Sequence, residues 1–409
     1  MSGTAAVDST YAWLRLAACL ALTTVGSAGM YVVVVALPAF QSDFAISRAG
    51  ASVPFTMVML GFGCGGIATG WLVDRFGVAK PLAVSTLGLG FAYLGAAHAG
   101  SFASFALMHV LIGWCGCAAV FGPLLADVSK WFQRQRGLAV AIGASGNYLA
   151  GALWPRPLQH FIERDGWRHT YVMMGLAGIV IMLPLVAMLR RRPEAGAIIP
   201  GGGGTAGTPA ALGLSPATLT AMLCLAGLGC CIAMAMPQVH LVSLCADRGF
   251  GVARGAEMLS VLLGCGIVSR LTFGLISDRI GGLRTLLISS GLQCLALFLF
   301  LPAKTLSSLY LVAALFGLSQ GGIVPCYAVT VREYFPEAEA GSRIGLIIFA
   351  TIVGMAVGGW GSGAIFDWTG SYTVAFIHGI GWNFVNLWVV LFLLSRVRGQ
   401  MHGTVGVAA

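Results

Sequence analysis

Charge is almost absent from twelve long apolar stretches of this 409-residue chain, and this feature limits its possible folds more than any other. Each stretch has roughly the 20 residues that an α-helix needs to cross the hydrocarbon core of a bilayer. Only 9% of all residues are charged, against about 25% in an ordinary soluble domain, so a water-soluble surface is excluded. We therefore expect an all-α integral membrane protein with twelve transmembrane helices. The predicted spans are 14–38, 52–73, 81–99, 102–126, 138–160, 169–189, 217–245, 256–277, 284–302, 306–332, 343–366 and 372–395.

The basic residues lie between the apolar stretches, singly or in threes, which is typical of topology determinants and not of a nucleic-acid surface. If both termini are placed in the cytoplasm, fifteen of the 23 Lys and Arg residues are cytoplasmic, seven lie on the opposite side, and Arg270 lies within a span. This bias predicts a multi-pass protein of the cell membrane, specifically a bacterial inner membrane, with both termini cytoplasmic and no nucleic-acid partner.

The composition of residues 191–216 differs from that of the rest of the chain. Gly, Pro, Ala and Thr predominate there, with four consecutive glycines at 201–204, and such a segment is typical of a flexible cytoplasmic linker. The linker divides the chain into two halves of six spans each, at 1–190 and 217–409.

A loop pattern repeated after the second span of each half supports this division. Both copies read GxxxDRxGxx followed by Lys or Arg, and they are 204 residues apart. In this pattern the Asp can face a helix N-terminus, where the helix dipole favours negative charge, and the glycines allow a tight turn. The two copies contain Gly70, Asp74, Arg75 and Gly77, and Gly274, Asp278, Arg279 and Gly281.

The repeated loop resembles the signature that major facilitator superfamily transporters carry between their second and third helices. The resemblance implies two pseudo-symmetric six-helix halves that transport a substrate by alternating access. It also implies that the loop latches the cytoplasmic side and breaks as the halves rock. We therefore interpret the eight loop residues as gating residues, while a loop that only sets topology remains the simpler alternative.

Further stretches resemble the monocarboxylate transporter and oxalate/formate antiporter branch of that superfamily. They are KWFQRQRGLA from Lys130, GASG from Gly143, GWR from Gly166, GLSQGG from Gly317 and DWTG from Asp367. Each motif is short, but together they follow the order of that branch across most of the chain. The resemblance implies that the substrate is a small carboxylate.

Arg270 is the one charged residue well inside a predicted span. At a helical rise of 1.5 Å per residue it lies about 12 Å from Asp278 and about 20 Å from Glu257, near the middle of the membrane. Burying a charge there costs about 2.5–3.5 kcal/mol, so such a residue is a functional candidate. A guanidinium binds a carboxylate through two hydrogen bonds. We expect Arg270 to anchor a substrate carboxylate; snorkelling, or bonding to helix-end carbonyls, is the alternative.

Arg270 lacks the partners that the resemblance implies. Many monocarboxylate transporters carry an Asp four residues before this Arg and a Lys in the first helix. Here the first position is Gly266, and residues 17–40 have no charge. His109 and His378 are the remaining titratable candidates for a proton site, although a lone membrane histidine is more often a packing residue. Symport, antiport and uniport therefore stay open.

Aromatic and amide side chains are further candidates for substrate contacts. A carboxylate site needs one cation, a few hydroxyl or amide donors and an apolar wall. Each candidate could equally be a packing residue or an interhelical hydrogen-bonding group. The candidates are Tyr327, Phe121, Asn147, Tyr148 and Tyr31.

Other classes of function find little support in the sequence. Asp and Glu total 14 and lie almost wholly in loops, so we expect neither an enzyme with paired acids nor a catalytic, metal or cofactor site. A non-transporting sensor is a remote alternative, because the longest stretch outside the spans, 190–216, is too short for an output domain. We expect a monomer whose partners are the lipid bilayer and a small carboxylate, with a proton left open. Dicarboxylate exchange, sugar transport and drug efflux are the alternatives within the superfamily.

Overall fold

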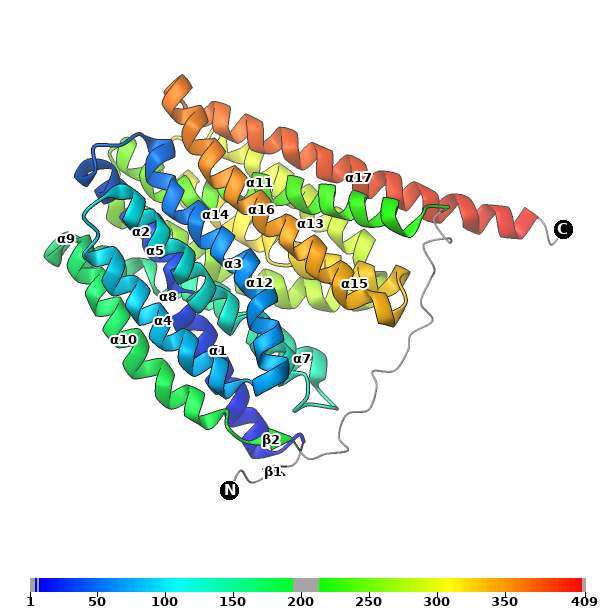
Figure 1. Ribbon diagram of the computed structural model, residues 1–409. Helices are drawn as coiled ribbons and strands as arrows, with labels where there is room; N and C mark the ends of the chain where they lie inside the picture. The colour runs from blue at the N-terminus through cyan, green and yellow to red at the C-terminus, as the bar shows by residue number, and fades with distance from the viewer. Residues whose placement is uncertain (1–3, 6, 194–212, 407–409) are drawn as a thin grey trace. The chain divides into compact units, whose positions relative to one another are not determined.

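The computed structural model describes residues 4–5, 7–193 and 213–406, and these are nearly all helical (Figure 1). Two strands of two residues each, β1 (Thr4–Ala5) and β2 (Arg192–Pro193), pair in parallel. Most of the predicted linker, residues 194–212, lies outside the described residues. The chain forms two compact units. Unit 1 comprises Met1–Pro200 and Gln238–Gly264, and unit 2 comprises Gly201–Pro237 and Cys265–Ala409.

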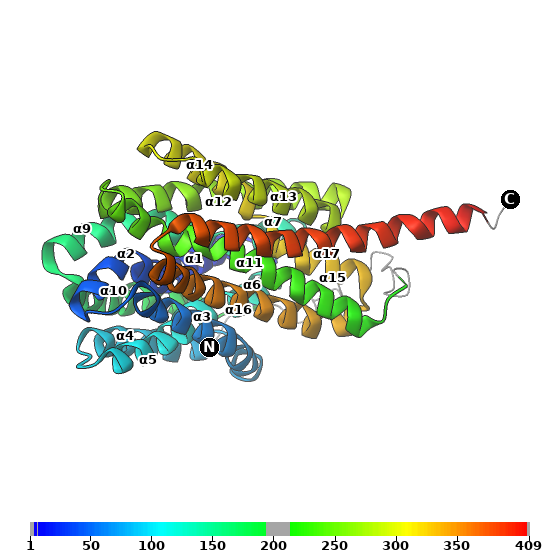
Figure 2. The same cartoon turned by 90° about the horizontal axis from the view of Figure 1, so that it is seen from above.

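The helices of the first half all belong to unit 1, in which α4 packs along α10 and α3 packs along η1 (Figures 1 and 2). Their bounds are α1 (Thr10–Gly26), α2 (Ala28–Asp43), α3 (Arg48–Phe76), α4 (Ala79–Ala97), α5 (Phe102–Leu111), the π-helix η1 (Ile112–Ala118), α6 (Gly122–Val128), α7 (Arg136–Ala144), α8 (Gly146–Leu153), α9 (Pro155–Asp165) and α10 (Trp167–Met188).

In unit 2, α13 packs along both α14 and α17. The second half contains α11 (Pro216–Asp247), α12 (Val252–Ile280), α13 (Gly282–Phe300), α14 (Leu306–Gln320), α15 (Ile323–Tyr334), α16 (Glu337–Thr369) and α17 (Tyr372–Gly406). The last ten residues of α11 and the first half of α12 belong to unit 1.

Ten helical stretches of the described chain are long and apolar enough to cross a membrane. The two other predicted spans correspond to the 19-residue α4 and to the consecutive short helices α7, α8 and α9. Helices satisfy all their backbone hydrogen bonds internally, as the apolar interior of a bilayer requires. The expected all-helical membrane fold is thus confirmed, and twelve spans are consistent with these elements.

Four of the predicted spans are interrupted, which the sequence analysis did not predict. The first breaks at Ser27, between α1 and α2, and the tenth breaks at Gly321 and Gly322, between α14 and α15. In the fourth and fifth spans, the last helical segment has a proline in its first turn. These residues are Pro123 in α6 and Pro155 in α9. Proline lacks the N–H that a helix interior uses but is tolerated in a first turn, so a new helix starts there.

The 204-residue repeat extends to the backbone of the loops. Gly77 and Gly281, one in each loop copy, have φ of 76° and 85°, a region that glycine adopts readily and other residues do not. The capping boxes Ser101–Ser104 and Thr305–Ser308 start α5 and α14 and are also 204 residues apart. In each box two side chains satisfy backbone N–H groups at the helix start. The two halves therefore share turns and caps.

Glycines set the closest helix approaches inside unit 1. A Cβ on Gly61 would lie 2.0 Å from the carbonyl oxygen of Val110, and a Cβ on Gly113 would lie 2.0 Å from that of Val58. The backbones of α3 and of the fourth span are therefore in direct contact, as small residues allow in membrane helices. The π-helix η1 begins two residues after Val110, inside this contact.

Candidate functional site

Arg270 lies in α12 with 8% of its surface exposed. Its Nε–H donates to the carbonyl oxygen of Gly321 over 3.3 Å, and the backbone N–H of Gly321 donates to Oγ of Ser269 over 3.0 Å. A Cβ on Gly321 would lie 2.3 Å from the carbonyl oxygen of Gly266. Glycine at position 321 is therefore required for α12 to approach the break between α14 and α15 this closely.

The bond to Gly321 places the guanidinium at the C-terminal end of α14. Carbonyl groups at a helix C-terminus lack partners within the helix and carry the negative end of its dipole, so a cation is stabilised there. Arg270 thus makes a helix-end carbonyl bond in this conformation, which the sequence analysis held open as an alternative role. A guanidinium has five N–H donors, which is enough to bond a helix-end carbonyl and a carboxylate together.

Tyr327 lies in a cluster that joins α11, α13, α15 and α17 inside unit 2. Its hydroxyl accepts a hydrogen bond from Nδ2 of Asn386 over 2.7 Å and donates to Sγ of Cys230 over 3.4 Å. Nε2 of Gln293 donates to the Cys230 carbonyl and to Oδ1 of Asn383, both over 3.0 Å. All five residues are fully buried. The cluster cross-links four helices, which is the usual role of amides and hydroxyls inside membrane proteins.

The candidates of the first half lie in unit 1. The hydroxyl of Tyr31 in α2 lies 3.0 Å from Oδ1 and 3.1 Å from the carbonyl oxygen of Asn147 in α8, so the structure brings these two together. Tyr148 is 7% exposed. Phe121 occupies the break between η1 and α6, where its ring meets the edge of Phe62 at a centroid distance of 5.9 Å.

The two histidine candidates differ in their surroundings. His109 is fully buried, with Nδ1 2.7 Å from the Phe105 carbonyl oxygen and Nε2 3.0 Å from the Tyr171 hydroxyl. Nδ1–H therefore donates to the carbonyl oxygen, and the two bonds fit a histidine that packs between helices. His378 is half-buried, and its Nε2 accepts a hydrogen bond from Nε1 of Trp382 over 3.0 Å.

The charged residues of both loop copies are exposed. Within the described parts of the chain, none of Asp74, Arg75, Asp278 and Arg279 forms an ion pair. The Arg75 guanidinium instead lies 5.6 Å from the ring centroid of Trp71, a cation–π contact. A Cβ on Gly70 or on Gly274 would meet no described atom within 4 Å.

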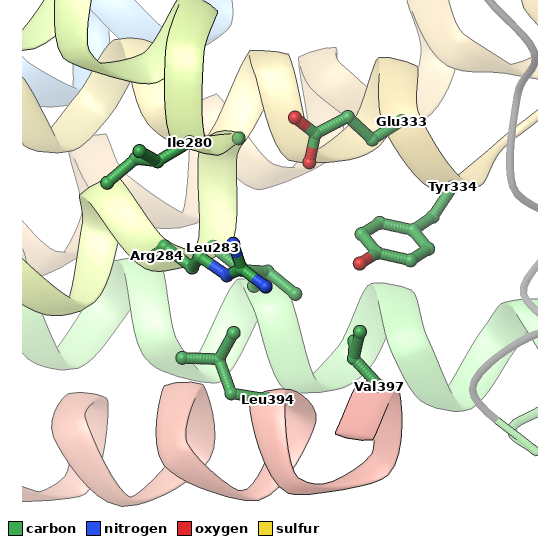
Figure 3. Close-up of a pocket in the computed structure, with 8 residues that line it drawn as sticks. Ile280, Leu283, Arg284, Glu333, Tyr334, Leu394 and Val397 are labelled. Atoms are coloured by element: carbon green, nitrogen blue, oxygen red, sulfur yellow. The ribbon is translucent and has the colours of Figure 1, made fainter. Parts of the chain in front are cut away.

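The helix N-terminus beside the second loop is capped by a residue outside the loop. Oε1 of Glu333, near the end of α15, accepts a hydrogen bond from the backbone N–H of Gly282, the first residue of α13, over 2.8 Å. From the sequence, Asp278 was expected to face a helix N-terminus, but at this one the acceptor is Glu333. Glu333 and Arg284 line a cavity of about 330 Å³ next to this cap, shown in Figure 3. The other lining residues are Ile280, Gly281, Leu283, Tyr334, Leu394 and Val397.

A buried charge pair in the first half was not predicted from the sequence. Arg15 is one of the fifteen basic residues counted as cytoplasmic, but it is only 2% exposed. Its Nε and Nη2 donate to the two carboxylate oxygens of Asp127 over 2.7 and 3.0 Å, and its Nη1 donates to Tyr11. Trp131 covers the guanidinium at 4.7 Å. Asp127, an acidic residue directly after the predicted span 102–126, was the available signal.

The fold and its buried polar clusters define a multi-pass helical membrane protein with charged and amide groups inside the bundle. The sequence profile of the Major Facilitator Superfamily matches residues 19–301 and, in a second match, residues 223–408. These matches cover most of the chain, so the chain belongs to the major facilitator superfamily of membrane transporters. Among the described residues, no group of three His, Cys, Asp or Glu side chains is placed to hold a metal ion.

Similar proteins include fungal and mammalian transporters. The MFS-type transporter opdF of Penicillium oxalicum is 23% identical over 292 residues, which cover 70% of this chain and 66% of the relative. Monocarboxylate transporter 13 of Rattus norvegicus is 27% identical over 277 residues, which cover 65% of this chain and 62% of the relative. The chain thus spans just under two thirds of the length of these two relatives.

A solved structure has a similar fold. It is a bacterial homologue of the human lysosomal transporter Spinster in an inward-facing and unoccupied conformation. The two share a TM-score of 0.69 at 14% identity, over 96% of this chain and 97% of that one. The likeness confirms the fold that the sequence predicted, and twelve membrane helices are consistent with it.

Proposed function

We propose that the chain is a secondary transporter that moves a small organic anion, of the monocarboxylate class, across the membrane by alternating access. The observation that carries this proposal is Arg270, a buried guanidinium in the middle of α12. Burying a permanent cation inside a membrane span is costly, and such residues usually have a function. The likeness to a monocarboxylate transporter at 27% identity over part of the chain supports the same substrate class.

The surroundings of Arg270 suit an anion that arrives and leaves. Its Nε–H is held by the Gly321 carbonyl, which orients the guanidinium plane, and the Nη groups can bind a carboxylate. Gly266, four residues earlier, takes the place where the resemblance implies an Asp. Proton coupling through an Asp–Arg pair at these two positions is therefore not part of the proposal, in which the substrate carboxylate binds to Arg270.

The remaining expectations belong to the same proposal. The protein acts as a monomer in a bacterial inner membrane, with both termini cytoplasmic, and it carries out transport and not an enzymatic reaction. Tyr31 and Asn147 in the first half, and Tyr327 in the second, are proposed to shape the path of the substrate. Dicarboxylate exchange, sugar transport and drug efflux are the alternatives that the experiment must separate.

The experiment is uptake of labelled lactate, acetate and oxalate by the full chain in liposomes, with sugars and organic cations as competitors. We expect carboxylate uptake in the wild type, and at least a hundredfold loss in Arg270→Ala and Arg270→Lys, because a lysine cannot form two parallel bonds to a carboxylate. Arg254→Ala, which removes an exposed arginine at the start of α12, should transport normally.

Ser269→Ala separates substrate binding from support of the helix break. It removes the side-chain bond to the Gly321 N–H but keeps the guanidinium. If Arg270 only supports the break between α14 and α15, the Ser269 and Arg270 variants should lose transport together. Wild-type uptake in a folded Arg270→Ala protein would refute the anchoring role, and inhibition by sugars or cations but not by carboxylates would refute the substrate class.

A further inference from the structure

The cavity of about 330 Å³ beside Glu333 lies where four candidate membrane spans of unit 2 end (Figure 3). One span ends at Ile280 in α12, one begins at Gly282 in α13, one ends at Tyr334 in α15, and the apolar part of α17 runs to Val397. The ends of membrane helices mark the depth at which the hydrocarbon core of a bilayer gives way to the lipid headgroups. The cavity is therefore at headgroup depth.

Three polar side chains of the cavity carry complementary chemistry. Figure 3 shows the Glu333 carboxylate, the Tyr334 hydroxyl and the Arg284 guanidinium directed into the same space. Oε1 of Glu333 accepts the hydrogen bond from the Gly282 N–H over 2.8 Å, and Oε2 accepts none within the described residues. Arg284 likewise forms no ion pair in the part of the chain that the structure describes. The cavity thus offers a cation, an anion and a hydroxyl to a bound molecule.

Apolar side chains form the rest of the cavity wall. Leu394 and Val397, about one turn apart on α17, lie across the cavity from the three polar groups in Figure 3. Ile280 and Leu283 complete the lining on the side of α12 and α13. A small soluble ion has no use for such a wall, whereas a molecule with a polar head and apolar chains can contact both sides.

The internal repeat shows that the acid of this cavity is specific to the second half. Lys80 stands 204 residues before Arg284, so the first half keeps the cation, but the residue 204 positions before Glu333 is Ser129. The helix that corresponds to α13 is α4, and it begins without a side-chain cap. A carboxylate is therefore not needed to start a helix at this place in the repeat, and the structure of the turn alone does not explain Glu333.

We propose that this cavity binds the headgroup of an aminophospholipid with a primary amine, the class of phosphatidylethanolamine. Arg284 and the Tyr334 hydroxyl bind the phosphate, for which a guanidinium is well suited. Oε2 of Glu333 accepts a hydrogen bond from the ammonium group, and the wall on α17 contacts the start of the acyl chains. Basic pockets between membrane helices bind anionic headgroups, but here an anionic headgroup would meet the carboxylate as well. A zwitterion matches both charges.

The test is native mass spectrometry of the full chain released from detergent micelles, with added phosphatidylethanolamine or phosphatidylglycerol of identical acyl chains. Because the chains are identical, the ratio of the two dissociation constants depends on the headgroup alone. We expect wild type to bind phosphatidylethanolamine at least about fivefold more tightly, because phosphatidylglycerol has no amine and places its negative charge near Glu333.

Glu333→Gln tests the role of the acid without removing the cap, since its amide oxygen can still accept the Gly282 hydrogen bond. The preference for phosphatidylethanolamine should disappear in this variant, whereas a purely structural role for Glu333 would leave the preference as it is. Arg284→Gln should weaken the binding of both lipids about tenfold, because it removes the charged partner of the phosphate. Lys80→Gln, at the equivalent position of the first half, is the matched control and should change neither affinity.

Glycerophosphoethanolamine, which has the same headgroup and no acyl chains, separates a lipid from a soluble ligand. A lipid site predicts little displacement of bound phosphatidylethanolamine by this compound. Full displacement at a concentration near the dissociation constant of the lipid would overturn the lipid assignment in favour of a soluble zwitterion. Equal binding of both lipids to wild type, or an unchanged preference in Glu333→Gln, would overturn the site itself. None of these results depends on carboxylate uptake, so the proposed function stands or falls separately.

Discussion

At the scale of single residues, the Arg15–Asp127 pair is buried and bidentate, with side chains 2% and 12% exposed. Removing one partner of such a pair leaves an uncompensated buried charge, which costs about 3–5 kcal/mol. We therefore expect Asp127→Ala to lower the free energy of unfolding by that amount, measured by reversible unfolding in mixed detergent micelles. Glu257→Ala, which breaks the more exposed pair with Arg254, should cost about 1 kcal/mol or less. Equal losses in the two variants would contradict the assignment.

Tyr327 offers a second test at this scale. Its hydroxyl is fully buried and bonded to Asn386 and Cys230, so its removal leaves polar groups with fewer partners. We expect Tyr327→Phe to lower the free energy of unfolding by about 1–3 kcal/mol, with a smaller effect on carboxylate affinity. An unchanged stability together with a large loss of affinity would instead show direct contact with the substrate.

The bonds of these residues also show what the sequence could not predict. A buried arginine in α12 was predictable because charge is so rare in the spans. The acceptor at Gly321 was not, because it depends on how α12 packs against a break 51 residues later in the chain. The same holds for Arg15, whose partner lies 112 residues away. Hydropathy identifies which residues enter the membrane but does not pair them.

At the scale of elements, uninterrupted spans were predictable and interruptions were not. The spans predicted at 81–99 and 284–302 correspond to Ala79–Ala97 and Gly282–Phe300, within two residues at each end. By contrast, the span at 102–126 is formed by α5, η1 and α6. The average apolarity of a segment does not depend on whether its backbone hydrogen bonds continue, so a π-helix in contact with another helix leaves no hydropathy signal.

The contact between α3 and the fourth span yields a prediction for this scale. Gly61→Ala would place a Cβ 2.0 Å from the backbone oxygen of Val110, so we expect a loss of about 1–3 kcal/mol from overpacking. Gly66→Ala, in the same helix, meets no described atom within 4 Å. It should gain up to about 1 kcal/mol from the higher helix propensity of alanine. Thermal unfolding of the two purified variants compares them, and similar melting temperatures would contradict this packing.

At the scale of the whole molecule, the 204-residue repeat relates the two halves down to single turns. Gly166 and Gly370, which precede the last helix of each half, both have positive φ, at 80° and 65°. In the sequence, this symmetry was visible only in the two copies of the repeated loop. The departures from symmetry are more informative for function. Arg270 corresponds to Gly66, and Tyr372 corresponds to Arg168, which pairs with Asp43. At each of these positions only one half carries a charge.

The orientation predicted from the charge distribution can be tested directly. In the predicted topology fifteen of the 23 basic residues lie on the side of the termini, and basic loops are retained in the cytoplasm. A green fluorescent protein fused after Ala409 should therefore fluoresce in bacteria. Alkaline phosphatase fused after Arg248, between α11 and α12, should be active because it reaches the periplasm. The opposite pattern, a dark terminal fusion and an inactive phosphatase, would show that the protein has the reverse orientation. The repeated loops around Asp74 and Asp278 would then face outward.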